Sequence, residues 1–257
     1  LSMDAGDTLT VEAGGTFRVA GNQAISINGG STGDGIVITN DGTIEAVPTS
    51  DSNGRAITGS TPADDRTLTI INRGDILSAN DTIRIADSSS NPSGGGVVTI
   101  DNAGRIISSG LSNTGVVSQS AQAIEMGVGA GTLNVTNREG GVIEGTAHGI
   151  QTAAGANVVV NSGRIAAVGT PSAQGEGIRT NLTSSNPGLN PTLDLTNEAS
   201  GVIVGGYGVT GLGSTTIVNR GTIMGDSDSA VSHARTAIRI LNNFEGQANS
   251  VTLAAGS

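Results

Sequence analysis

Two short motifs in this sequence have the spacing of known catalytic or nucleotide-binding loops. GGSTG at 29–33 matches Gly-x-Ser-x-Gly, the turn that presents a nucleophilic serine between a strand and a helix. GYGVTG at 206–211 matches Gly-x-Gly-x-x-Gly, which binds a dinucleotide diphosphate where a strand leads into a helix. No helix-forming segment follows either motif, and a chain rich in Gly and Ser produces such matches by chance. We therefore expect neither motif to form a site.

Residues of catalytic types also occur together in the segment DSDSAVSHART. Its Asp228, Ser232 and His233 are the residue types of a hydrolytic triad, but a triad needs rigid geometry and this segment has the composition of a loop insertion. The other histidine, His148, precedes a Gly-Ile pair at the start of an expected strand. We predict that His148 lies on the surface.

Metal-binding residue types are scarce. The chain has no cysteine, which excludes disulfides, thiolate metal sites and cysteine nucleophiles. The acidic pairs Asp64-Asp65 and Asp226/Asp228 are the only carboxylate clusters with the chemistry of a Ca²⁺ site. Neither has the spacing of an EF-hand or of a Gly-rich nonapeptide repeat. We therefore predict solvated loops at both places, with no metal and no cofactor.

The composition favours strands and turns over a conventional globular core. Of 257 residues, 41 are Gly and only three are aromatic, whereas the β-branched residues Ile and Val are frequent and regularly spaced. The net charge of −10 argues against nucleic acid or an anionic membrane surface as a partner. No run of about 20 apolar residues is present, so no membrane-spanning helix is expected.

A repeated phrase indicates how the strands are organised. The pattern aliphatic-x-Asn-x-Gly-x-Ile occurs five times, and two further copies carry two extra residues before the Gly. The seven copies are ITNDGTI at 38–44, IINRGDI at 70–76, IDNAGRI at 100–106, VTNREGGVI at 135–143, VVNSGRI at 159–165, LTNEASGVI at 195–203 and IVNRGTI at 217–223. A shorter phrase, a small residue followed by Ile or Val, alternates with them, as in Ala24-Ile25 and Gly177-Ile178.

Three short strands per unit of roughly 20 residues, each followed by a turn, are typical of a parallel β-helix. We therefore predict an all-β solenoid of about eight coils, because one coil cannot bury its own aliphatic residues and must stack on its neighbours. The Asn of each phrase is expected at a sharp corner, where stacked amides form a ladder. The predicted ladder consists of Asn40, Asn72, Asn102, Asn137, Asn161, Asn197 and Asn219. Leucine-rich repeats also have an Asn ladder, but here Ile and Val dominate over Leu.

A row of polar residues is expected outside the shorter phrase. Side chains alternate along a strand, so the residue after each inward Ile or Val points outward. Stacking aligns Ser26, Thr58, Arg84, Glu125, Gln151, Arg179, Thr210 and Arg239. We expect Arg84 and Glu125 to pair across adjacent coils on a solvated face, beside a shallow strip of small residues. A sharper hypothesis makes Arg84, Glu125, Gln151 and Arg179 a binding strip for a polar ligand or another rod.

The phrases ITNDGTI, IVNRGTI and VTNREGGVI, alternating with QAI, HGI and EGIRT, resemble bacterial autotransporter passenger domains. The final SVTLAAGS at 250–257 is similar to the segment where such passengers approach their translocation barrel. The resemblance covers nearly the whole chain and implies a right-handed parallel β-helix carried across a Gram-negative outer membrane by type V secretion. The sequence contains no barrel and no recognisable protease or esterase head.

On this basis we expect residues 1–257 to form one passenger segment, with a partial coil over 1–22 and a C-terminal end over 240–257 that leads to a barrel. The expected function is non-catalytic: an extracellular, surface-displayed or secreted adhesin or structural stalk that contacts a receptor or glycan on a host or neighbouring cell, or another rod. Two alternatives are a polysaccharide-acting β-helix enzyme and a scaffold for a catalytic domain outside this segment.

Overall fold

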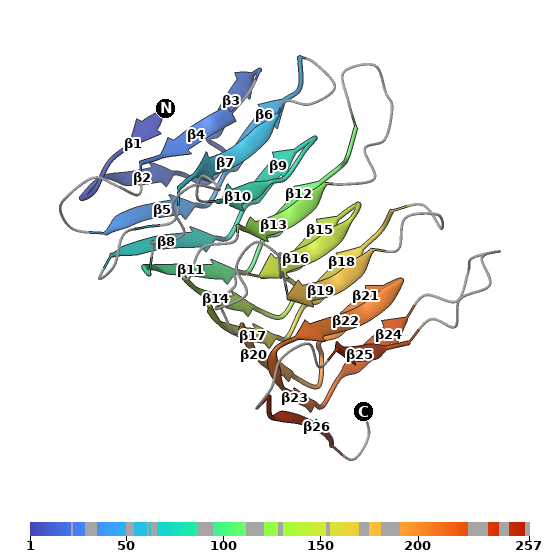
Figure 1. Cartoon of the computed structure of the whole chain (residues 1–257). Helices are drawn as coiled ribbons and strands as arrows, with labels where there is room; N and C mark the ends of the chain where they lie inside the picture. The colour runs from blue at the N-terminus through green and yellow to red at the C-terminus, as the bar shows by residue number, and fades with distance from the viewer. Residues whose placement is uncertain are drawn as a thin grey trace.

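A computed structural model describes residues 1–21, 23–28, 35–49, 54–60, 62, 66–86, 95–111, 121–127, 131–152, 155–169, 175–180, 191–225, 236–241 and 247–254. These residues form 26 strands and no helix, so within them no helix could cross a membrane. From β1 to β23, each strand pairs in parallel with the third strand after it, and the coils progress from one end of an elongated body to the other (Figure 1). The predicted parallel β-helix is therefore confirmed. GGSTG, Asp64, Asp65, Asp226, Asp228, Ser232 and His233 lie outside the described residues.

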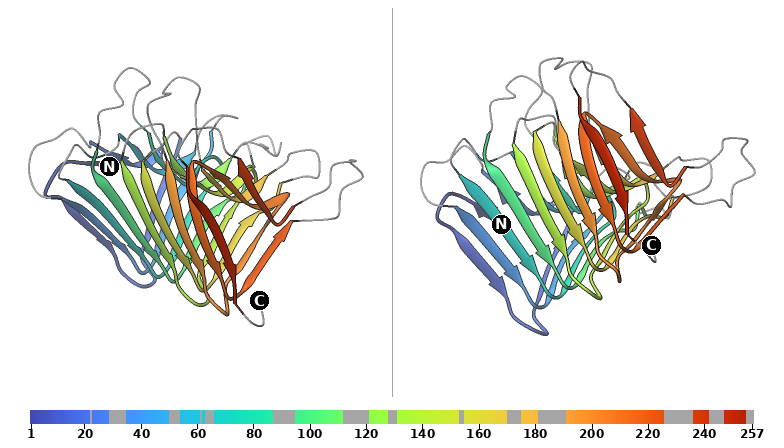
Figure 2. Two further views of the ribbon diagram at one scale, coloured as in Figure 1. Left: turned by 60° about the horizontal axis from the view of Figure 1, so that its bottom comes forward. Right: turned by 90° about the horizontal axis from the view of Figure 1, so that it is seen from below.

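Three sheets make the walls of the solenoid, and Figure 2 shows their strands running side by side along it. Sheet A contains β1 (Ser2–Met3), β4 (Gln23–Ile27), β7 (Arg55–Gly59), β10 (Ile83–Ile85), β13 (Gln122–Met126), β16 (His148–Thr152), β19 (Glu176–Thr180), β22 (Tyr207–Leu212) and β25 (Ile238–Leu241). Sheet B contains β2 (Thr8–Val11), β5 (Ile36–Asn40), β8 (Thr67–Asn72), β11 (Val97–Asn102), β14 (Thr132–Asn137), β17 (Ala156–Asn161), β20 (Thr192–Asn197), β23 (Ser214–Asn219) and β26 (Asn249–Leu253). Sheet C contains β3 (Thr16–Ala20), β6 (Thr43–Val47), β9 (Asp75–Ser78), β12 (Arg105–Ser108), β15 (Val142–Gly145), β18 (Arg164–Ala167), β21 (Val202–Gly205) and β24 (Thr222–Gly225).

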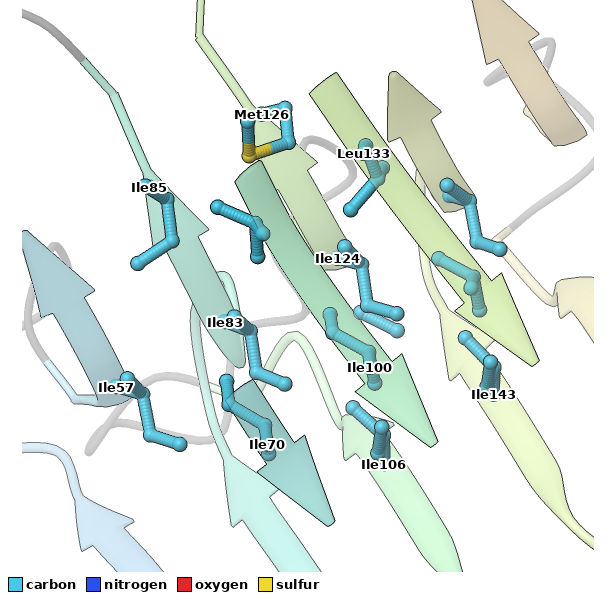
Figure 3. Packing of buried hydrophobic residues seen from close by; sticks show 14 of the residues in the cluster. Ile57, Ile70, Ile83, Ile85, Ile100, Ile106, Ile124, Met126, Leu133 and Ile143 are labelled. Carbon is cyan, nitrogen blue, oxygen red and sulfur yellow. The ribbon is translucent and has the colours of Figure 1, made fainter. Parts of the chain in front are cut away.

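The interior is filled by columns of aliphatic side chains, as the repeat predicts. Sheet A contributes Ile83 and Ile124, sheet B contributes Ile70 and Ile100, and sheet C contributes Ile106. All five are buried, and they converge in the space between the sheets (Figure 3). Burying each such side chain contributes about 1.5–3 kcal/mol. The strands must stack in this register because a slip of one residue would turn every column outward.

The small residue before each buried Ile of sheet A faces the interior, and not the outer surface as we expected. Ala24, Ala56 and Ala123 are buried, so they do not form the predicted shallow outer strip. A methyl group on Gly149 would come within 2.7 Å of Cγ2 of Ile165 on sheet C. The chain turns here from sheet C into sheet A, so two consecutive residues face the interior and the first must be small.

The corner between sheets B and C carries the Asn ladder. All seven Asn residues are buried, and the side-chain amide of each of the first six donates a 2.8 Å hydrogen bond to the side-chain oxygen one coil further on. The ladder runs from Asn40 through Asn72, Asn102, Asn137, Asn161 and Asn197 to Asn219. It ends where Val11 and Leu253 occupy the equivalent positions. The glycines of this corner lie so close that a Cβ on Gly74 would overlap the carbonyl oxygen of Gly42.

Connection lengths distinguish sheet A from this corner. The step from sheet B to sheet C is short, as between Asn72 and Asp75. Long connections instead lead into or out of sheet A, over 86–96, 109–121 and 181–191. Inserted sequence therefore adjoins both ends of the sheet A strands.

Candidate functional site

The strand register of sheet A aligns the row of polar residues expected outside the solenoid, which we call the outer row. It consists of Ser26, Thr58, Arg84, Glu125, Gln151, Arg179, Thr210 and Arg239. Arg84, Glu125, Gln151 and Arg179 are consecutive members on β10, β13, β16 and β19. The four residues of the predicted binding strip are therefore neighbours on one sheet face.

A second row lies beside the first and was not anticipated. It comprises the outward residue two positions before each buried aliphatic residue, and we call it the strand-start row. Its members are Gln23, Arg55, Asp81, Gln122, His148, Glu176 and Tyr207. The sequence signal for this row is the polar residue directly before each small-Ile phrase, as in QAI, HGI and EGI.

Four charged residues connect the two rows at β7, β10 and β13. Arg55 Nε lies 3.1 Å from an oxygen of Asp81. Arg84 lies 3.8 Å from Asp81 and, through Nε, 3.0 Å from Glu125, so the predicted Arg84–Glu125 pair is present. Gln151 donates a 3.5 Å hydrogen bond to Glu125. The carboxylates are well shielded, since the side chains of Asp81 and Glu125 are only 5% and 14% exposed. This part of the face is not the freely solvated surface that the sequence indicated.

Glu125 titrates far from the ordinary range of a glutamate. Burial raises the pKa of Glu125 to about 7, and the neighbouring Asp81 carboxylate raises it further, while Arg84 opposes both effects. The side chain therefore changes charge near neutral pH. A carboxyl group held in this way can donate a hydrogen bond at mildly acid pH and accept one at alkaline pH.

His148 joins the two rows further along sheet A. It is only 7% exposed, so our prediction of a surface position was wrong; Glu176 and Arg179 on the next coil contact the two ring nitrogens. Nδ1 lies 2.8 Å from Oε2 of Glu176, whereas the backbone nitrogen of Glu176 is 3.3 Å away. Nε2 lies 3.4 Å from Arg179. A guanidinium group can only donate, so Nε2 is the acceptor in the contact with Arg179, and a neutral imidazole then carries its proton on Nδ1.

The side chains of the two rows offer hydrogen-bond donors, hydrogen-bond acceptors and guanidinium groups, which suit a polar or anionic ligand. Across the described ranges, no three His, Asp or Glu side chains gather closely enough to hold a metal ion. The GYGVTG motif forms most of β22, which leads into β23 and not into a helix, so it lacks the setting of a dinucleotide site.

No protein family, curated protein or solved structure gives a significant match to this chain. The function must therefore be argued from the fold and from the two polar rows of sheet A.

Proposed function

We propose that this chain is a non-catalytic rod of the autotransporter passenger kind, secreted or displayed on a Gram-negative cell surface, and that sheet A is its recognition face. The partner would be a receptor or glycan on a host or neighbouring cell, or another rod. The observation that supports this is the alignment of two polar rows along the outer side of sheet A, joined by the Arg84–Asp81 and His148–Arg179 contacts.

The polar rows differ from the ion pairs elsewhere on the solenoid. Arg73–Asp41 and Arg138–Asp101 also join adjacent coils, but their arginines are exposed, and ion pairs in water contribute little to stability. On sheet A, Glu125 is held against a desolvation penalty that an ordinary solvated surface would not impose. Groups held at such a cost are enriched at functional sites.

Display on bacteria tests the proposal. The chain would be fused to an outer-membrane translocator barrel in a non-adherent Gram-negative strain, and a strain displaying the barrel alone would be the control. We expect increased attachment to an epithelial cell layer or increased clumping of the bacteria. Attachment and clumping equal to the barrel-only strain, with the folded chain verified on the surface by antibody, would contradict the proposal.

A second candidate function is cleavage of a polysaccharide, which the Asp81–Glu125 pair favours. Two interacting carboxyl groups of which one, Glu125, keeps its proton up to about pH 7 have the acid–base character that glycoside hydrolysis needs. The test is release of reducing ends from acidic and neutral polysaccharides. Turnover by the parent chain that is lost in Glu125→Gln would support the enzyme, and no turnover on any substrate would leave the binding function.

A further inference from the structure

The basic residues of this protein separate into two kinds. All twelve are arginine. Eight of the described arginines lie within 4.0 Å of a carboxylate; these are Arg18, Arg55, Arg73, Arg84, Arg105, Arg138, Arg164 and Arg220. On sheet A, Arg179 and Arg239 have no such partner within the described ranges. Arg179 faces Nε2 of His148, and Arg239 lies over the ring of Tyr207, 4.9 Å from its centroid.

Thr210 lies between these two arginines in the outer row. Its register partners are Arg179 on one side and Arg239 on the other. Because neighbouring strands are about 4.8 Å apart, the backbones that carry the two arginines are about 9–10 Å apart. Thr210 is only 3% exposed, and its hydroxyl oxygen has no hydrogen-bond partner among the described residues. A buried polar atom without a partner is uncommon, so this hydroxyl group is available to hydrogen-bond a ligand between the two arginines.

We infer that Arg179, Thr210 and Arg239 bind a carboxylate or sulfate group of an acidic polysaccharide whose chain lies along the outer row. The inference rests on the proposed function and specifies its ligand. A guanidinium offers five N–H donors, so Arg179 can hold the His148 contact and still bind an oxyanion. The Thr210 hydroxyl would donate between the two guanidinium groups. The Tyr207 ring supports the cation of Arg239 without neutralising it.

Charge and geometry favour an acidic glycan over other partners. The molecule carries a net charge of −10, and most of its arginines are already paired, so unpaired guanidinium groups are the main attraction for an anion. The row continues from Arg179 into Gln151 and Glu125, whose side chains suit sugar hydroxyl groups. An extended peptide would instead pair with a sheet edge. The interior strands of sheet A have both edges paired.

Calorimetric titration of the purified chain tests the inference with three probes: a galacturonate oligosaccharide, a sulfated heparin oligosaccharide and neutral dextran. We expect at least one acidic probe to bind, more weakly at high salt, and dextran not to bind. Arg179→Gln and Arg239→Gln should each lower the affinity about tenfold, because each removes a charge-assisted hydrogen bond. Arg73→Gln, which removes an equal charge from the opposite corner, should leave the affinity unchanged.

Thr210→Val separates a ligand contact from a structural role. Valine has nearly the same shape and removes a buried hydroxyl without a partner, so the melting temperature should stay equal or rise while affinity for the acidic probe falls about threefold to tenfold. We expect Thr210→Val to keep the fold, so its affinity for the acidic probe still tests the inference if an arginine variant unfolds. Affinity unchanged in Thr210→Val and in the folded arginine variants would overturn the inference, as would equal binding of dextran.

The outcomes also separate this inference from the proposed function. Bacterial attachment without binding of either acidic probe would overturn the acidic-glycan inference and leave the recognition function in place. Binding of an acidic probe that Arg239→Gln and Thr210→Val weaken, in a chain that mediates neither attachment nor clumping, would support the site and contradict the adhesive function.

Discussion

Arg84 and Glu125 occupy equivalent positions on neighbouring coils, and Nε of Arg84 lies 3.0 Å from Oε2 of Glu125. The same guanidinium group lies 3.8 Å from Asp81, so one cation lies near two carboxylates. It does not fully offset their burial and mutual repulsion, since the pKa of Glu125 is still raised to about 7. This cluster makes the sheet A face respond to pH in a way that can be measured.

Stability should fall as the pH rises through the titration of Glu125. Because the pKa of Glu125 is about 7 in the folded chain and about 4.5 when unfolded, the folded state binds more protons between these values. The contribution of protonated Glu125 to the free energy of unfolding is complete below about pH 4.5 and is lost as the pH approaches and passes 7. Glu125→Gln should remove this dependence and raise the free energy of unfolding at pH 8 by on the order of 2 kcal/mol. Urea denaturation of parent and variant at pH 5 and 8 measures the difference, and parallel pH profiles would contradict the burial of this carboxyl group.

Charges placed in the central aliphatic column should disrupt stacking. Ile100 and Ile217 are fully buried in the same column of sheet B. Asp at either position should lower the free energy of unfolding by about 3–5 kcal/mol, because it buries an unpaired charge. Thr99→Asp on the outer side of β11 is the matched control and should cost less than about 1 kcal/mol. Thermal melts in which all three variants match the parent would refute the column.

The Asn ladder should be weakest at its start. Asn102 accepts from Asn72 and donates to Asn137, so Asn102→Ala removes two rungs and should cost about 2–4 kcal/mol. Asn40 donates to Asn72, but its own side-chain oxygen is buried without a partner among the described residues. Asn40→Ala should therefore cost less, about 1–2 kcal/mol. Equal losses of stability in the two variants would mean that the rungs act independently of their position.

The fold was predictable because its strongest constraints recur in the sequence. Every corner between sheets B and C from Asn40 to Asn219 needs an amide that bonds to its neighbour, and each coil needs Ile or a similar residue in each column. Both requirements repeat residue types at a nearly fixed spacing. The outer row was predictable for the same reason, since it follows from alternation beside a buried column.

The rest of the site was not predictable in this way. The strand-start row has no fixed residue type, and its members Asp81, His148 and Glu176 are functional candidates only because of contacts between coils. Alternation also fails where the chain turns from sheet C into sheet A, because both Gly149 and Ile150 face inward. A surface position was expected for His148 because the sequence does not show that Glu176 and Arg179 on the next coil contact its ring.

The measurement that tests the recognition face most directly compares two charge-matched double variants displayed on bacteria. Arg84→Ser with Arg179→Ser alters sheet A, whereas Arg73→Ser with Arg138→Ser removes the same charge from the corner between sheets B and C. Thermal melts of the purified chains establish that each variant is folded. We predict that attachment or clumping falls at least about tenfold in the sheet A variant and is unchanged in the corner variant. Equal attachment by the two variants, at a melting temperature equal to that of the parent, would contradict sheet A as the recognition face.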